Sequence, residues 1–193
     1  MDYEALRRVA DEMSDFAEHL EGRWDFEIGR QGIVMMMSPV KRHEGVAYLI
    51  TRQLEAQLPG THPGYVAQAG AEVESPSLGR KRRPDAVVLP LETLLGAGDT
   101  VDPGELLLVV EVVSASNPEN DYVDKMADYP AMGIPIYLLV DPRKAIVFVH
   151  SDPGPTAHGI SYRNTHEYVF GDKVAVGPWN IVTSDFPRYD DPE

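Results

Sequence analysis

Cysteine is absent from this chain of 193 residues. Without thiols the protein has no disulfide framework, no thiolate zinc site and no cysteine nucleophile. No apolar run approaches the ~20 residues of a membrane span, and residues 1–13 lack the basic start and apolar stretch of a secretory signal. We therefore expect a cytoplasmic protein without membrane contact, whose chemistry depends on oxygen and nitrogen ligands.

Basic residues are scarce: 17 Lys and Arg stand against 31 Asp and Glu, which gives a net charge of −14. A uniform surface of this charge repels polyanions, and this excludes a histone-like coating protein. The charge is uneven, because four basic residues are consecutive and the next one is Lys125, in a stretch rich in acids. That stretch is either a solvated acidic surface or a cation site beside an anion-binding patch. The basic run consists of Arg80, Lys81, Arg82 and Arg83.

The length fits a single domain over residues 1–193, and the 43% of hydrophobic residues suffice for a core. Apolar spacing and turn residues predict helices and strands in irregular alternation. The expected class is α/β (mixed α+β), with a central mixed sheet flanked by helices. The N-terminal segment 1–22 holds a helix over 3–20, residues 151–188 form short strands, and 189–193 is a loose tail. Between them we expect strands over 24–28, 33–37, 65–73, 84–89, 105–113, 136–140 and 145–150, and helices over 41–58 and 116–131.

Two carboxylates stand at the ends of apolar strands: Asp85 precedes residues 86–89 and Glu111 follows residues 107–110. If these strands pair antiparallel with Leu89 opposite Leu107, the two carboxylates lie within ~5–6 Å of each other. Parallel pairing would separate them by about 15–20 Å. Two neighbouring acids with water suit Mg²⁺. The alternative is that both are strand-end residues with unrelated roles.

Lys125 is the charged residue nearest the apolar face of the helix expected over 116–131. Its long stem could reach back to the end of a strand. The alternative is a simple surface pair with Asp121, one helical turn earlier.

The order of several short motifs resembles a known family. Pro84-Asp85 is followed by Glu111-Val112-Val113-Ser114, by Asp121 and Lys125 four residues apart, by Tyr129, and by the segment 133–142 (GIPIYLLVDP). Together they resemble the Uma-type restriction endonucleases, formerly a domain of unknown function, in the PD-(D/E)XK nuclease superfamily. Upstream, Glu27, Gly32, residues 35–39 and His43 resemble the opening of the same family.

The resemblance implies a restriction-endonuclease-like core over residues 24–150, in which Asp85 and Glu111 hold Mg²⁺, or Mn²⁺ in its place. In the superfamily a lysine usually stands two residues after the second acid, where this chain has Val113. Within the family a lysine on the following helix takes over, and Lys125 matches that position. Glu27 and His43 match supporting positions near the site.

The function that follows from the resemblance is metal-dependent hydrolysis of DNA phosphodiester bonds. Arg80, Lys81, Arg82 and Arg83 would then contact phosphates beside the cut, or they form a flexible surface loop. The competing interpretation is a catalytically inactive nuclease-fold module that binds nucleic acid or a protein partner, and Val113 and the net charge favour it. A serine hydrolase is excluded because no Gly-x-Ser-x-Gly motif is present. A homodimer is the commonest assembly for such a chain.

Overall fold

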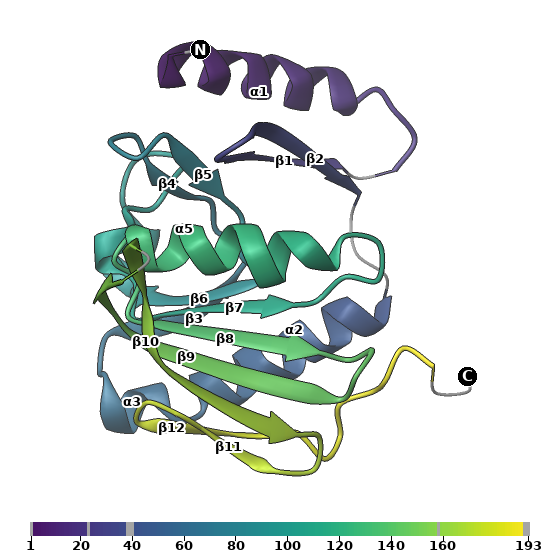
Figure 1. The fold of residues 1–193 in the computed structure, drawn as a ribbon, viewed down its shortest axis with the longest axis vertical. Helices are drawn as coiled ribbons and strands as arrows, with labels where there is room; N and C mark the ends of the chain where they lie inside the picture. The colour runs from purple at the N-terminus through teal and green to yellow at the C-terminus, as the bar shows by residue number, and fades with distance from the viewer. Residues whose placement is uncertain (1, 23, 38–40, 158, 191–193) are drawn as a thin grey trace.

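The computed structural model describes residues 2–22, 24–37, 41–157 and 159–190 (Figure 1). The α-helices are α1 (Tyr3–Ala17), α2 (Lys41–Glu55), α3 (Leu58–Thr61), α4 (Leu91–Leu94) and α5 (Met126–Ala131). A 3₁₀ turn, η1 (Pro103–Glu105), and a π-helical segment, η2 (Asn120–Lys125), complete the helical elements. The strands are β1 (Trp24–Gly29), β2 (Gly32–Met37), β3 (Tyr65–Ala69), β4 (Val73–Ser75), β5 (Arg80–Arg82), β6 (Ala86–Pro90), β7 (Leu108–Val112), β8 (Ile136–Asp141), β9 (Ile146–Thr156), β10 (Gly159–Val169), β11 (Lys173–Val176) and β12 (Trp179–Val182).

The elements form layers that Figure 1 shows from the side. Helix α1 lies against a small sheet of order β2-β1-β5-β4. The continuous helix of η2 and α5 separates this sheet from a larger one of order β10-β9-β8-β7-β6-β3. Helix α2 and the β11–β12 hairpin cover the opposite face of the larger sheet. The predicted mixed sheet flanked by helices is confirmed.

The register of β6 against β7 determines where the two acidic residues meet. These strands pair antiparallel, with Ala86 opposite Val110 and Val88 opposite Leu108. One step further along this register, Asp85 lies opposite Glu111, as the apolar runs predict. Strand β7 pairs with β8 in parallel and is buried along its whole length. Because the central strands are covered on both faces, their sequences are almost continuously apolar.

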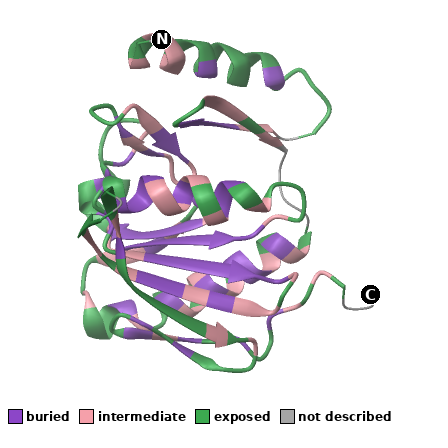
Figure 2. Cartoon of the chain, in the orientation of Figure 1, coloured by how far each residue is buried: buried purple, intermediate pink, exposed green. Residues whose placement is uncertain are grey.

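Alternate residues of these strands face different layers. Val88, Val110 and Leu138 face α2, where they pack with Ile50 and Leu54 in one apolar core. Their neighbours in sequence, among them Val87, Val109 and Leu139, face α5 and pack with its Tyr129 in a second core. Figure 2 shows this burial along the central strands. Glu111 belongs to the second set, so its carboxylate points to the side of η2 and α5.

The structure corrects several boundaries that local patterns predict. Pro59 and Gly60 lie inside the short helix α3 instead of ending α2. The strand expected over 65–73 is two strands, β3 and β4, and the first half of the helix over 116–131 is the π-helical η2. Strands β9 and β10 are long, with 11 residues each, where the sequence predicts short strands.

The two ends of the chain differ from the sequence prediction in detail. Helix α1 ends at Ala17, three residues earlier than expected. In the predicted loose tail, Tyr189 is held by its hydroxyl, which donates to the Val113 carbonyl oxygen at 2.8 Å. Residues 191–193 of that tail, and the Ser38-Pro39 pair before α2, lie outside the described residues. Within the described ranges, no helix is long and apolar enough to cross a membrane.

Candidate active site

Asp85 is fixed at the start of β6 by the neighbouring strand and by α2. Its Oδ2 accepts a hydrogen bond from the backbone N–H of Val112 at 2.7 Å and lies 3.3 Å from His43 Nε2. Burial alone would lower the pKa of His43, but its hydrogen bond to Asp85 raises it overall. The histidine is therefore stabilised in its charged form beside the carboxylate.

Glu111 meets two donors from the helix above the sheet. Its Oε1 lies 2.8 Å from Lys125 Nζ and also accepts a hydrogen bond from the Tyr129 hydroxyl. Lys125 is the last residue of η2 and Tyr129 lies in α5, so both reach down to the same strand end. The same ammonium lies 3.3 Å from Asp121 Oδ1 and 3.4 Å from Glu27 Oε1. The two alternatives considered for Lys125 are therefore both observed: its ammonium pairs with Asp121 and also reaches Glu111 at the end of β7.

The protonation of this cluster follows from burial and charge. Burial alone would lower the pKa of Lys125, but Glu111, Glu27 and Asp121 raise it well above its usual value. Burial raises the pKa of Glu111 well above its usual range, although Lys125 acts in the opposite direction. Lys125 is therefore a permanent cation and a hydrogen-bond donor, and it is no general base at neutral pH.

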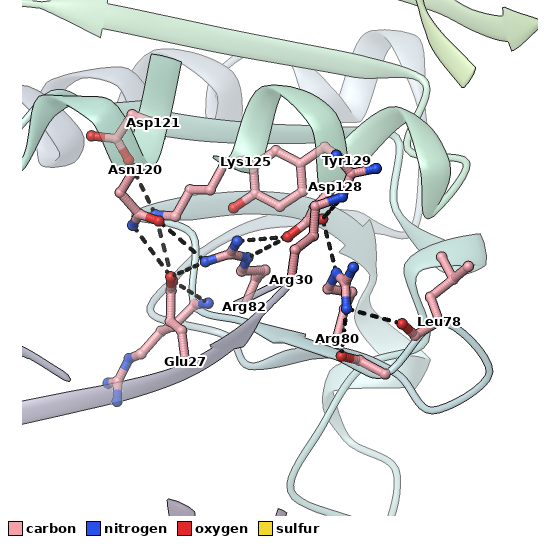
Figure 3. A network of polar contacts seen from close by, with 12 residues as sticks. Glu27, Arg30, Leu78, Arg80, Arg82, Asn120, Asp121, Lys125, Asp128 and Tyr129 are labelled. Carbon is pink, nitrogen blue, oxygen red and sulfur yellow. Dashed lines mark hydrogen bonds and ion pairs between the residues drawn. The ribbon is translucent and has the colours of Figure 1, made fainter. Parts of the chain in front are cut away.

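Glu27 links Lys125 to a second buried network, shown in Figure 3. Its side chain is fully buried on β1, and its Oε2 accepts from Arg82 at 2.8 Å. Arg82 also pairs with Asp128 at 2.6 Å, and it donates to Asn120 Oδ1 at 3.2 Å. Burial alone would raise the pKa of Glu27, but Lys125 and Arg82 lower it overall. The network ties β1, β5 and the η2–α5 helix together directly behind Lys125.

A cavity of about 480 Å³ opens above these groups. Asp85, Glu111, Lys125 and His43 line it, and they are joined by Arg83. Its walls come from β1 and β2, from α2, from the ends of β3 and β7, and from residues 114–121. The structure therefore brings both predicted metal ligands, the predicted lysine and one supporting residue to one cavity, with Glu27 behind it.

The predicted phosphate-binding run is divided by the structure. Arg80–Arg82 form β5 and not a flexible loop. Arg82 is fully buried in the network of Figure 3, and Lys81 pairs with Glu72 at 2.7 Å. Arg80 pairs with Asp128 at 2.9 Å. Of the four basic residues, Arg83 lines the cavity, where it pairs with Asp25 at 2.7 Å. Arg82 stabilises the interior, and its burial does not agree with the prediction that it contacts phosphates.

Sequence reasoning assigned no role in the site to three of its contributors. Tyr129 belongs to the motifs that resemble the family, but the structure is needed to show that its hydroxyl donates a hydrogen bond to Glu111. Asn120 and Asp128 carry no local signal, because their partners Glu27 and Arg82 are far away in the sequence. The helical spacing of residues 121, 125, 128 and 129, which places them within about 100° of one another around the predicted helix, is one hint that the sequence offers.

The donor set is compatible with a hard, hydrated cation. In the part of the chain that the structure describes, no three His, Asp or Glu side chains form a metal-binding group. Asp85 uses Oδ2 and Glu111 uses Oε1 in the contacts above. Both residues line the same cavity. Mg²⁺ is commonly held by one or two carboxylates, with water and substrate phosphates as its other ligands.

Comparisons with known proteins place this arrangement in a class. A solved structure entitled "Crystal structure of a putative nuclease belonging to DUF820 from Anabaena variabilis ATCC 29413" shares the fold, with a TM-score of 0.66. The match covers 89% of this chain and 94% of that chain at 13% sequence identity. The fold is thus that of a nuclease-like protein. The chain belongs to the Uma2 family, described as "Putative restriction endonuclease", whose model matches residues 11–175. No curated protein matches it.

Proposed function

We propose that this chain is a metal-dependent endonuclease that hydrolyses DNA phosphodiester bonds. The observation that carries the proposal is the antiparallel register of β6 and β7, which brings Asp85 and Glu111 to one cavity beside Lys125. Family membership and the nuclease-like fold support the same conclusion.

Asp85 and Glu111 would hold a divalent cation, Mg²⁺ or Mn²⁺. When bound, such a cation polarises the scissile phosphate and lowers the pKa of a bound water. Lys125 donates hydrogen bonds, so it would orient the attacking water or a phosphate oxygen and offset negative charge in the transition state. Tyr129 and Glu27 keep Glu111 and Lys125 in place through the contacts described above. His43 does the same for Asp85.

The position of Lys125 argues against the inactive module. Val113 occupies the usual lysine position, but it is fully buried in the apolar core on the α5 side of the sheet. A lysine there would be costly. Lys125 instead supplies the cation 2.8 Å from Glu111, from the next element of the chain. Although Val113 replaces the usual lysine of the superfamily, the ammonium of Lys125 therefore still supplies a positive charge beside Glu111.

A plasmid-nicking assay tests the proposal. With Mg²⁺ or Mn²⁺ the wild type should cut DNA, and it should not cut in EDTA. Asp85→Asn and Lys125→Met should each lower the rate by about 10²–10³-fold, the usual loss for a group that stabilises transition-state charge. Lys173→Met is the matched control, because Lys173 is exposed on β11 and should leave the rate unchanged.

Two outcomes would contradict the proposed function. If folded wild-type protein cuts no single-stranded, duplex or branched DNA, and calorimetry detects no metal uptake, the chain is the non-catalytic module. Cutting that survives both substitutions would place the chemistry elsewhere in the molecule.

A further inference from the structure

The reactive groups lie at the bottom of the cavity. The side chains of Glu111 and Lys125 are 3% and 4% exposed, and that of Asp85 is 19% exposed. By contrast, Glu44 and Asn117, which also line the cavity, are exposed. A phosphodiester must therefore enter the space of about 480 Å³ before it meets the carboxylates. This volume falls in the range of small-molecule pockets, about 300–1,000 Å³.

An intact duplex fits this entrance poorly. Double-stranded DNA is stiff, and it carries one negative charge per ~1.7 Å of its axis, twice the density of one strand. Asp25, Glu44 and Asp121 line the cavity together with the two proposed ligands. Among the described residues, the lining cations are Arg83, Lys125 and His43, and each is already paired with a carboxylate. The charge of the cavity thus favours a substrate that brings few phosphates.

One wall of the cavity is apolar and faces the polar floor. Met36 of β2 forms it, whereas the side chain of its neighbour Met35 points to the opposite face of β2, toward α1. The Met36 Sδ accepts a hydrogen bond from Asn120 Nδ2 at 3.4 Å, and Asn120 also contacts Glu27 and Arg82. Thioethers make favourable contacts with aromatic rings. A base stacked inside a duplex has no free face for such a contact, whereas an unpaired base does.

We propose that the cavity binds an unpaired nucleotide, with its base against Met36 and its phosphate at the floor. The site would then act on single strands and unpaired ends instead of the interior of a duplex. The cleavage part rests on the proposed function, whereas the binding part stands on the cavity alone.

Binding to the wild type is the first test. Fluorescence anisotropy compares one labelled oligonucleotide as a single strand and as a blunt duplex, in EDTA and in Ca²⁺. The single strand should bind at least about tenfold more tightly, a difference that 1.4 kcal/mol produces. Equal or tighter binding of the duplex would overturn the proposal.

Substitution of the wall is the second test. Met36→Glu should weaken binding of the single strand about tenfold, because it replaces an apolar contact by a like charge. Met36→Leu keeps an apolar side chain and should lose less binding than Met36→Glu. Ile160→Glu, at an exposed position on β10 outside the cavity, adds the same charge and should change nothing. If Met36→Glu is folded and binds normally, Met36 is not the docking surface. The wild-type comparison stands even if this variant fails to fold.

Cleavage separates this inference from the proposed function. With Mg²⁺, a duplex that carries a single-stranded flap should be cut within the flap. Cutting of the duplex interior at a similar rate would overturn the inference and leave the endonuclease activity intact. Selective single-strand binding without cleavage of any substrate would support the inference and refute the proposed function.

Discussion

On one face of the six-stranded sheet, Val110, Leu138 and Leu108 pack in an apolar core with side chains from α2 and the β11–β12 hairpin. On the other face, Glu111 stands in the same row as Val109 and meets Lys125 instead of an apolar partner. The same strands build both faces, because alternate side chains point to opposite sides. One face therefore contributes mainly burial, and the other combines burial with a network of charges.

The difference between the faces teaches how their side chains depend on one another. Apolar contacts are non-directional, so the loss of one leaves the others nearly intact. In the charged network each group offsets the burial of its neighbours, and removal of one leaves another charge unpaired. We expect substitutions on the apolar face to change stability alone, and substitutions on the charged face to change stability and activity together.

The largest loss of stability is expected from Arg82→Met. The substitution leaves Glu27 and Asp128 buried without their guanidinium partner, which costs about 3–5 kcal/mol of unfolding free energy. Chemical denaturation measures it, and the cutting rate should fall as well because Glu27 holds Lys125. Addition of Asp128→Leu should recover part of the stability, since one unpaired charge is removed. Strictly additive losses would refute the coupling.

On the apolar face, Leu108→Ala should lower the unfolding free energy by about 3 kcal/mol, through lost burial and an unfilled cavity. Leu108 is fully buried and lies outside the active-site cavity. The midpoint of denaturation should therefore shift while the rate per folded molecule remains that of the wild type. A large fall in that rate would show that the two faces are not separable.

The pH dependence of the unfolding free energy tests His150, a polar residue on the face of the sheet that also carries Glu111. His150 packs against the rings of Tyr137 and Tyr162, and burial lowers its pKa to about 4. Between about pH 6.5 and pH 4 the unfolded chain binds the extra proton and the folded chain does not, so stability falls on acidification. This residue should contribute at most about 3 kcal/mol to that fall, because each pH unit between the two pKa values is worth about 1.4 kcal/mol. His150→Gln should flatten the curve, and His166→Gln at an exposed position should not.

The smallest loss of stability is expected from removal of the Arg163–Asp152 ion pair. This pair is exposed and joins β10 to β9. Exposed ion pairs contribute roughly 0–1 kcal/mol because water and salt screen them. Arg163→Met should therefore leave the midpoint of chemical denaturation unchanged within experimental error. A loss comparable to that of Arg82→Met would show that burial is not what distinguishes the two pairs.

The strand register is the part of the site that the sequence predicts best. The apolar runs after Asp85 and before Glu111 have one alignment that buries both, and that alignment brings the acids together. Lys125 is predictable for a similar reason, because helical spacing places it beside the apolar face. Both predictions rest on local patterns whose physical cause, burial of apolar side chains, acts over the whole domain.

The basic run illustrates what local patterns cannot reveal. Arg82 stands among charged residues and its sequence suggests a solvated loop, but it is buried because Glu27 and Asp128 come from distant parts of the chain. The π-helical turn of η2 is equally hidden, since its residues have ordinary helical spacing in the sequence. Long-range charge pairing and one extra residue in a turn leave no periodic signal.

The π-helical turn also bears on how related chains should be aligned. A π-helical turn holds one residue more than an α-helical turn, and η2 spans the residues from Asn120 to Lys125. A relative with one residue fewer in this span would form a regular α-helix. Its counterparts of Asn120 and Asp121 would be rotated by about 100° relative to Lys125. A single-residue gap at this point of an alignment would therefore mark chains that keep the helix and lose the arrangement of the site.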